Sequence, residues 1–373
     1  MKNNKFLPLA IPDLSGNEEK YLNSCLKSSW ISSKGIFIDR FEKKFADFTG
    51  TKYAISTSNG TTALHLILSA LGCGPGDEVI VPDLTFVATA NTVTFTGAKP
   101  VLADIDKESW NISPKRIRQK ITKRTRGIIA VHLYGNPADM AEILAIAGEH
   151  NLWVIEDAAE AHGAGIKIAG RWKKVGSIGV AGIFSFYGNK IITCGEGGMV
   201  TTDNRQLAEK MKILRDHGQD PLKRYYHPVI GFNYRLTNMQ AAIGLAQLER
   251  VKDFLKAREK IAAGYRQKLK RVKGLKFQEQ NPGKKSVCWL FSMTVESPFK
   301  LTRDRLIEVL QKNGIESRPF FHPLHSMPPY HEKKTYKEAE FLAGHGISLP
   351  SFVTITDSQI ERVTEIIKHY ASN

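Results

Sequence analysis

Cysteine is scarce in this sequence and follows no pattern. The 373 residues include four cysteines, Cys25, Cys73, Cys194 and Cys288, all far apart. Disulfide frameworks and zinc sites depend on closely spaced cysteine or cysteine–histidine pairs. We therefore predict no metal site and no disulfide framework, and we interpret the thiols as buried or chemically idle.

Long apolar runs are missing as well. The opening stretch MKNNKFLPLAIPDLSG has one short apolar run, which Pro8 and Pro12 interrupt and Asp13 follows. A signal peptide or a membrane-spanning helix needs a longer unbroken apolar segment. We expect a cytoplasmic protein with no membrane association. Internal repeats and low-complexity tracts are also absent from the sequence.

Acidic residues are outnumbered, because 37 Asp and Glu face 53 Lys and Arg, for a formal net charge of +16. The densest basic run, residues 115–126, contains no acid, and Ile117 and Ile121 at helical spacing predict an exposed helix there. Nucleic-acid modules and interleaved aromatic residues do not accompany this charge. We therefore predict no nucleic-acid binding, and we attribute the charge to solvated helical faces and to attraction for phosphorylated substrates.

Short β-branched runs alternate with helical patterns through much of the chain. The runs are DEVIVP, PVLADI, RGIIAVHL and NLWVIEDA. This alternation predicts an α/β domain built on a mostly parallel sheet. One long helix is predicted in GFNYRLTNMQAAIGLAQLERVKDFLKAR, with Thr237 as its cap. Gly274 and the Asn281-Pro282-Gly283 turn follow. We place an N-terminal arm and large domain at residues 1–250, and a smaller α+β domain at residues 251–373.

A strand-turn-helix unit early in the chain is a candidate phosphate site. Residues 52–57 are predicted as a strand, SNGT as a turn and residues 62–71 as a helix. Free N–H groups at a helix start attract phosphate, and a glycine allows close approach. Units of this kind also occur without any ligand, so the residues alone leave both readings open.

The segment VIEDAAEAHGA brings carboxylates to the end of a predicted parallel strand. Ligands collect at the carboxyl ends of such strands. A carboxylate there could hold the protonated ring nitrogen of a pyridine cofactor, and Asp157 is our candidate. A helix-capping role for Asp157 is the structural alternative. We interpret His162 as a packing or support residue.

Lys190 is the candidate for covalent chemistry. It lies in IFSFYGNKIITCGEGGMV, between an apolar strand-like run and a turn that contains Gly195, Gly197 and Gly198. An amine held in a dry pocket has a lowered pKa, and it can form a Schiff base with an aldehyde such as pyridoxal phosphate. An ordinary surface lysine after a strand is the alternative.

Taken together, the motifs resemble the DegT/DnrJ/StrS family of nucleotide-sugar aminotransferases, which have the fold-type I, aspartate aminotransferase-like fold of pyridoxal phosphate enzymes. The resemblance covers essentially the whole chain. Its motifs are WISSKG, SNGTTALHL, VPDLTFVATAN, HLYGNPADM, EDAAEAHGA, SFYGNKIITCGEGGMV, GFNYRLTNMQAAIGLAQLE and RPFFHPLHSMPPY.

The resemblance implies a role for each member of a cofactor site. Lys190 would form the Schiff base, Asp157 would pair with the pyridinium nitrogen, Phe86 would stack on the ring, and Glu160, where many relatives have glutamine, would lie near the phenolic oxygen. The phosphate would be bound by Asn59, Gly60, Thr61 and Ser185, and Asn233 would come from a neighbouring subunit. The sugar nucleotide would lie near Arg235 and His325.

The resemblance also implies an activity. Glutamate would donate an amino group to the keto carbon of a nucleotide-linked 4-keto-6-deoxy sugar, for which GDP-4-keto-6-deoxymannose is the first candidate, in a surface polysaccharide pathway. The shared site would require a homodimer or a larger homo-oligomer. Two alternatives remain. The protein could be an aminotransferase for a UDP- or dTDP-linked ketosugar, or a regulatory protein without turnover. A dehydrating branch of the family has histidine in place of the lysine, so Lys190 favours amino transfer.

Overall fold

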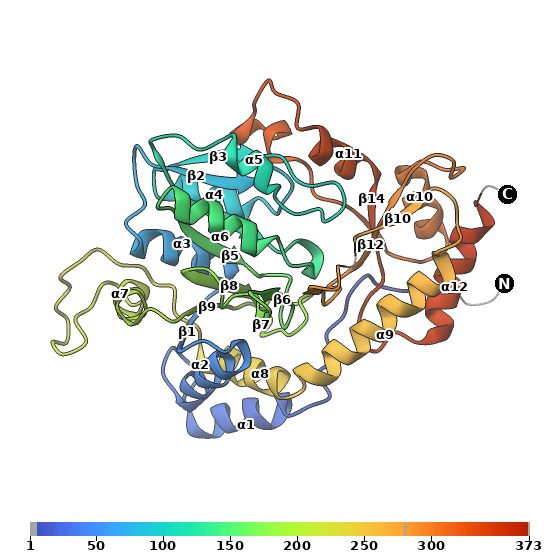
Figure 1. The fold of residues 1–373 in the computed structure, drawn as a ribbon. Helices are drawn as coiled ribbons and strands as arrows, with labels where there is room; N and C mark the ends of the chain where they lie inside the picture. The colour runs from blue at the N-terminus through green and yellow to red at the C-terminus, as the bar shows by residue number, and fades with distance from the viewer. Residues whose placement is uncertain (1–5, 280, 372–373) are drawn as a thin grey trace.

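The computed structural model describes residues 6–279 and 281–371. Figure 1 shows a large body around one sheet and a smaller body beside it, joined by the long helix α9. The strands are β1 (Tyr53–Thr57), β2 (Glu78–Pro82), β3 (Lys99–Ala103), β4 (Thr125–Val131), β5 (Trp153–Asp157), β6 (Gly165–Ile168), β7 (Arg171–Lys174), β8 (Ala181–Ser185), β9 (Gly198–Thr202), β10 (Leu275–Phe277), β11 (Lys284–Lys285), β12 (Phe291–Val295), β13 (Arg318–Pro319) and β14 (Gly346–Leu349).

The helices alternate with these strands in the first half of the chain. They are α1 (Glu18–Ser28), α2 (Ile36–Thr49), α3 (Gly60–Ala70), α4 (Ala88–Phe95), α5 (Pro114–Arg118), α6 (Met140–Glu149), α7 (Arg205–Arg215), α8 (Asn238–Glu249), α9 (Val251–Leu269), α10 (Arg303–Lys312), α11 (Lys337–His345) and α12 (Asp357–His369), with short 3-10 turns η1 (Leu133–Gly135), η2 (Leu324–Ser326) and η3 (Pro328–Tyr330).

The central sheet is mostly parallel, as the sequence predicts. Within the described residues it has seven strands in the order β1-β9-β8-β5-β4-β2-β3, and β9 runs antiparallel to both of its neighbours, β1 and β8. Successive residues of β4 pack into different cores, since Ile128 contributes to one hydrophobic cluster and Ile129 to another. A strand buried on both faces is typical of βαβ units. The fold is therefore of the α/β class that the sequence predicts. The carboxyl ends of its parallel strands are available to form a site.

Side-chain caps set several helix boundaries. Asn59, Thr237 and Thr356 each cap a helix through a reciprocal capping box, at the starts of α3, α8 and α12. Gly50 ends α2 with a φ of 80°, a conformation that glycine adopts without strain. The cap predicted at Thr237 is confirmed.

Two helix predictions are wrong in extent. The basic run forms only the short helix α5 before the chain turns and joins the sheet at Thr125, because the β-branched residues that follow pair with β2 and β5. Three of the four arginines of this run pair with acids, Arg118 with Glu149, Arg124 with Glu78 and Arg126 with Asp77. The long helix predicted after Thr237 is two helices, α8 and α9, which meet at Arg250.

A second core lies in the smaller body. The antiparallel sheet β10-β12-β14-β13 packs with α9, α10 and α12 around a hydrophobic cluster that includes Tyr265 and Phe291. Leu7 of the N-terminal arm joins this cluster, whereas Phe320 and Leu342 pack into the core of the large body. The division at residue 250 stays a prediction, because side chains cross it in both directions.

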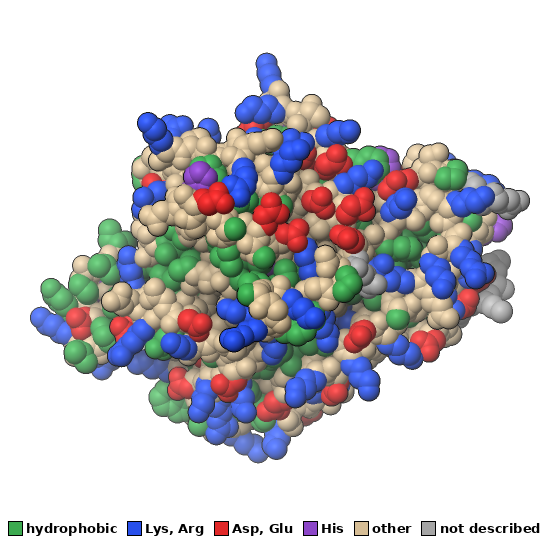
Figure 2. Space-filling model, viewed as in Figure 1, with side chains coloured by type: hydrophobic (Ala, Val, Ile, Leu, Met, Phe, Trp, Pro, Cys, Tyr) green, Lys and Arg blue, Asp and Glu red, His purple; other side chains and the backbone are tan. Residues whose placement is uncertain are grey.

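Charged side chains are mixed over the face that Figure 2 shows, where Lys and Arg are interspersed with Asp and Glu. Among the helices of the described residues, none combines the length and apolarity that crossing a bilayer requires.

Candidate functional site

Lys190 lies beyond the carboxyl end of β8, against an aromatic ring and a carboxylate. Its Nζ is 4.0 Å from the centre of the Trp289 ring and 3.8 Å from Oε1 of Glu160. Burial lowers the pKa of Lys190, while the charges of Glu160 and Asp157 oppose this shift. The amine is thus held in a mostly dry environment, as the sequence predicts for a nucleophilic lysine.

Asp157 is the last residue of β5, and its carboxylate is fixed on both oxygens. The Thr89 hydroxyl donates to Oδ2 at 2.9 Å, and the Ala159 N–H donates to Oδ1 at 3.2 Å. Burial raises the pKa of Asp157, and these two hydrogen bonds oppose the shift. Within the described residues no helix begins directly after Asp157, so the helix-cap alternative is wrong.

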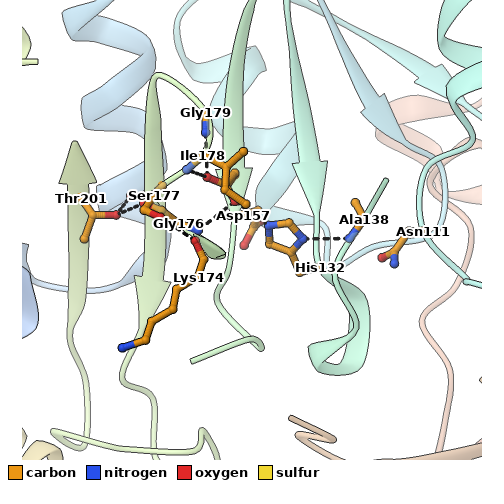
Figure 3. A network of polar contacts seen from close by, with 12 residues as sticks. Asn111, His132, Ala138, Asp157, Lys174, Gly176, Ser177, Ile178, Gly179 and Thr201 are labelled. Carbon is orange, nitrogen blue, oxygen red and sulfur yellow. Dashed lines mark hydrogen bonds and ion pairs between the residues drawn. The ribbon is translucent and has the colours of Figure 1, made fainter. Parts of the chain in front are cut away.

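The neighbouring Glu156 anchors this strand end from the other side. Its carboxylate accepts from the N–H groups of Gly176, Ile178 and Gly179 at 2.6 to 2.8 Å. The buried His132 accepts from the Ala138 N–H through Nδ1, so its proton lies on Nε2, 3.1 Å from Glu156 (Figure 3). This satisfied network fixes the position of β5, and therefore the direction of Asp157.

Glu160 follows one turn later and is also buried. Its Oε2 accepts from the Tyr134 N–H at 2.8 Å. Burial raises the pKa of Glu160 to about 7, and the charge of Lys190 opposes the shift. Glu160 therefore changes its protonation state near neutral pH, and its Oε1 lies 3.8 Å from Nζ of Lys190. Nearby His162 is enclosed by phenylalanine rings, and burial lowers its pKa to about 3, in agreement with a packing role.

The predicted phosphate turn forms the start of α3. Asn59 Oδ1 accepts from the Thr62 N–H at 2.9 Å, and the Thr62 hydroxyl lies 3.1 Å from the Asn59 N–H, which donates to it. The first N–H groups of a helix have no partner inside the helix. Since the cap satisfies that of Thr62, the N–H groups of Gly60 and Thr61 are those that would hold an anion.

Two glycines let the chain close around this turn. A Cβ on Gly60 would lie 3.0 Å from Cβ of Ser185, and a Cβ on Gly198 would lie 2.3 Å from the Asn59 carbonyl oxygen. Gly198 is also the register partner of Ser185 between β8 and β9. Ser185 is thereby brought next to the start of α3, as a shared phosphate site requires.

Phe86 lies in the turn between β2 and α4, with an exposed ring. Its side chain is 56% exposed, and its centroid lies 5.8 Å from that of Phe321. The Thr89 N–H donates to the Phe86 carbonyl at 3.2 Å. The turn that carries the proposed stacking ring is therefore bonded to the start of α4, where the Thr89 hydroxyl binds Asp157.

Asn233 and Arg235 flank a residue that contacts the phosphate turn. The Ser58 N–H donates to the Tyr234 carbonyl at 2.9 Å. Asn233 is exposed, and Arg235 pairs with Asp216. The single chain thus leaves the Asn233 side chain open toward the outside, and its service to a neighbouring subunit stays a prediction.

His325 lies in η2 and is buried. Its Nδ1 is 2.7 Å from Oδ2 of Asp83, and its Nε2 is 3.2 Å from Oε1 of Glu340. Both ring nitrogens are therefore occupied by carboxylates in this structure. The prediction that His325 lies near a sugar nucleotide remains untested.

The assembled groups fit pyridoxal phosphate. A helix start with two free N–H groups suits a phosphate, a fixed carboxylate suits a pyridinium nitrogen, and an amine with a lowered pKa suits an aldehyde. The close contacts at Gly60 and Gly198 bring Ser185 and β9 against the turn, at a distance that a larger side chain at either glycine would not allow. A cavity of about 860 Å³ beside α9, by contrast, does not include Lys190, Asp157 or Phe86 among its lining residues.

Three residues of the site are not evident from local patterns. Thr89, Trp289 and Tyr134 contact Asp157, Lys190 and Glu160, respectively. Thr89 lies inside the VPDLTFVATAN motif, which is the signal that could have identified it. Tyr134 likewise lies inside the HLYGNPADM motif, whereas Trp289 reaches the site only through the fold.

Comparison with known proteins gives a consistent result. Residues 12–368 match the model of the DegT/DnrJ/EryC1/StrS aminotransferase family. The GDP-perosamine synthases of Caulobacter vibrioides and Vibrio cholerae are 51% and 44% identical, covering 96% and 98% of this chain and 96% and 99% of their own. The crystal structure of DesV from S. venezuelae, in complex with a ketimine intermediate, superposes with a TM-score of 0.90 at 33% identity, covering 98% of this chain and 99% of DesV.

Proposed function

The chain belongs to the DegT/DnrJ/EryC1/StrS aminotransferase family, and from this we propose that it transfers an amino group from glutamate to the keto carbon of GDP-4-keto-6-deoxymannose, which gives GDP-perosamine. The substrate assignment rests on the similarity to GDP-perosamine synthases at 43% to 51% identity over nearly the whole chain. The chemical assignment rests on Lys190, whose amine is buried beside Glu160.

Bound pyridoxal phosphate would supply an aldehyde that condenses with amines, and a pyridinium ring that withdraws electrons from the neighbouring carbon. In the proposed site the N–H groups of Gly60 and Thr61, with Asn59 and Ser185, hold the phosphate. Asp157 keeps the ring nitrogen protonated, and its fixed hydrogen bond from Thr89 keeps the carboxylate in place. Phe86 covers one face of the ring.

Lys190 has two functions in this proposal. Its neutral amine would hold the cofactor between turnovers. Once the amino donor has replaced it, the free Nζ would accept a proton from the donor carbon and return it, as base and then acid. The same proton movement, run in the opposite direction, completes amination of the sugar. Because burial lowers the pKa of Lys190, the neutral amine is more accessible than in an exposed lysine.

Arg235 and His325 are proposed to lie near the sugar nucleotide. Each is already paired with a carboxylate, Arg235 with Asp216 and His325 with Asp83. Contact with substrate would therefore require these pairs to open or to share their donors. The exposed Asn233 is proposed to complete the cofactor site of a neighbouring subunit in a homodimer or a larger homo-oligomer.

Product analysis on a substrate panel tests the assignment. Purified enzyme with pyridoxal phosphate and glutamate is incubated with 4-keto-6-deoxy sugars linked to GDP, UDP or dTDP, and the products are analysed by mass spectrometry. The proposal predicts an amino sugar and 2-oxoglutarate with the GDP-linked sugar. Amination of a UDP- or dTDP-linked sugar alone would contradict the substrate, and no conversion of any sugar would contradict the activity.

A further inference from the structure

Asp83 joins the cofactor turn to a distant loop of the chain. It directly follows β2, and it is fully buried against η2, 242 residues away. The His325 N–H donates to Asp83 Oδ1 at 2.8 Å, and His325 Nδ1 lies 2.7 Å from Oδ2. The Leu324 N–H donates to the Asp83 carbonyl at 2.8 Å. Three contacts therefore fix this one residue to one loop.

The segment that Asp83 begins carries two groups of the proposed cofactor site. Phe86 presents its ring there, and Thr89 donates to Asp157. The Thr85 and Thr89 hydroxyls lie 3.3 Å apart, and the Thr89 N–H donates to the Phe86 carbonyl. The position of the turn thus sets the position of the stacking ring and of the hydrogen bond on the ring-nitrogen partner.

The same distant loop supports the turn at two further points. The Phe321 ring contacts Phe86, and the Tyr330 hydroxyl donates to Asn91 Oδ1 at 2.6 Å on α4. The ring contact joins the exposed Phe86 to the partly buried Phe321, and the hydrogen bond is part-buried, whereas the Asp83 contacts are buried. A buried carboxylate with fixed partners is the most costly of these to disrupt.

We propose that Asp83 is a positioning residue for the cofactor: its pair with His325 holds residues 83–89 so that Phe86 and the Thr89–Asp157 hydrogen bond are aligned with the pyridine ring. Asp83 acts through the turn rather than by contact with reacting atoms. The proposal rests on the cofactor assignment within the proposed function, but not on the identity of the sugar.

Cofactor affinity and local exchange in the apo-protein test this proposal. Asp83→Ala removes both side-chain contacts, Asp83→Asn keeps an acceptor for the His325 N–H, and Glu340→Gln changes the other carboxylate at the same imidazole without touching the turn. We expect Asp83→Ala to raise the Kd for pyridoxal phosphate about tenfold or more, since small displacements of positioning groups have large effects. The Kd of Asp83→Asn should lie between those of the wild type and Asp83→Ala, and the Kd of Glu340→Gln should stay within about twofold of the wild type.

Hydrogen exchange separates positioning from a general loss of stability. In Asp83→Ala we expect faster exchange of the amides in residues 84–91, with exchange in α8 unchanged. An unchanged Kd with unchanged exchange would overturn the proposal, and so would a raised KM for the nucleotide sugar with normal cofactor binding. If Asp83→Ala does not fold, as judged by circular dichroism, the same two outcomes for Asp83→Asn, in cofactor Kd and in hydrogen exchange, decide the proposal. Failure of every ketosugar to react would refute the proposed activity, yet leave the cofactor measurements interpretable.

Discussion

The Lys190 amine and the Glu160 carboxylate lie 3.8 Å apart, and each opposes the effect of burial on the other. Burial lowers the pKa of Lys190 and raises that of Glu160 to about 7. The negative charge of Glu160 favours the protonated amine, and the positive charge of Lys190 favours the ionised carboxylate. The reactivity of the lysine near neutral pH therefore depends on the state of its neighbour.

Glu160→Gln should shift the pH dependence of Lys190 to lower pH. The ionised Glu160 raises the pKa of Lys190, so its loss lowers that pKa further and leaves more neutral amine at a given pH. The rate at which apo-protein captures pyridoxal phosphate, followed by absorbance across pH 6 to about 9, should reach its plateau at lower pH than in the wild type. A profile that stays in place or moves to higher pH would contradict the coupling.

Asp157→Asn should strongly reduce turnover without unfolding the protein. The amide keeps the size of the side chain but cannot hold a ring nitrogen in its protonated form, so kcat should fall about 10²-fold or more. Thr89→Val removes only one hydrogen bond to the buried carboxylate and should lower kcat about tenfold. Steady-state kinetics and the thermal midpoints of both variants are the measurements, and equal effects on kcat would argue against this ranking.

Gly198→Ala should damage the phosphate turn. The added Cβ would lie 2.3 Å from the Asn59 carbonyl oxygen, so the backbone must move. We expect a loss of about 1 to 3 kcal/mol in the free energy of unfolding and weaker binding of pyridoxal phosphate. Gly148→Ala in α6 is the matched control, because no atom lies within 4 Å of its added Cβ. Equal cofactor affinity in both variants would speak against a phosphate site here.

Mixing two inactive variants tests the shared site. If Asn233 serves a neighbouring subunit, hybrids of Lys190→Ala and Asn233→Ala chains contain one complete site. After mixing in denaturant and refolding, activity should return to about a quarter of the wild-type value, since half of random dimers are hybrids with one good site each. Activity that stays at the level of the separate variants would show that Asn233 serves its own chain or no site.

Local patterns in the sequence were sufficient for the residues that end strands or begin helices. Asp157 ends β5, and the turn at Asn59 begins α3, so hydrophobic runs and cap residues indicated both. Lys190 follows β8 for the same reason. The family resemblance then gave these separate signals one shared chemistry.

Contacts between distant segments were beyond the reach of local patterns. Thr89 reaches Asp157 across 68 residues, and Asp83 reaches His325 across 242. Such pairs depend on strand order and loop packing, which periodicity does not specify. The basic run was misjudged for a related reason, because pairing in the sheet at Thr125 overrides its helical spacing.

Reductive trapping of the cofactor tests whether Lys190 is the residue that binds it covalently. Purified protein with pyridoxal phosphate is treated with borohydride, digested, and examined by mass spectrometry for a pyridoxyl group. The account predicts one modified peptide, which carries the group on Lys190, and none in Lys190→Ala. An unmodified Lys190 in protein saturated with cofactor, or a modification on another lysine alone, would contradict it.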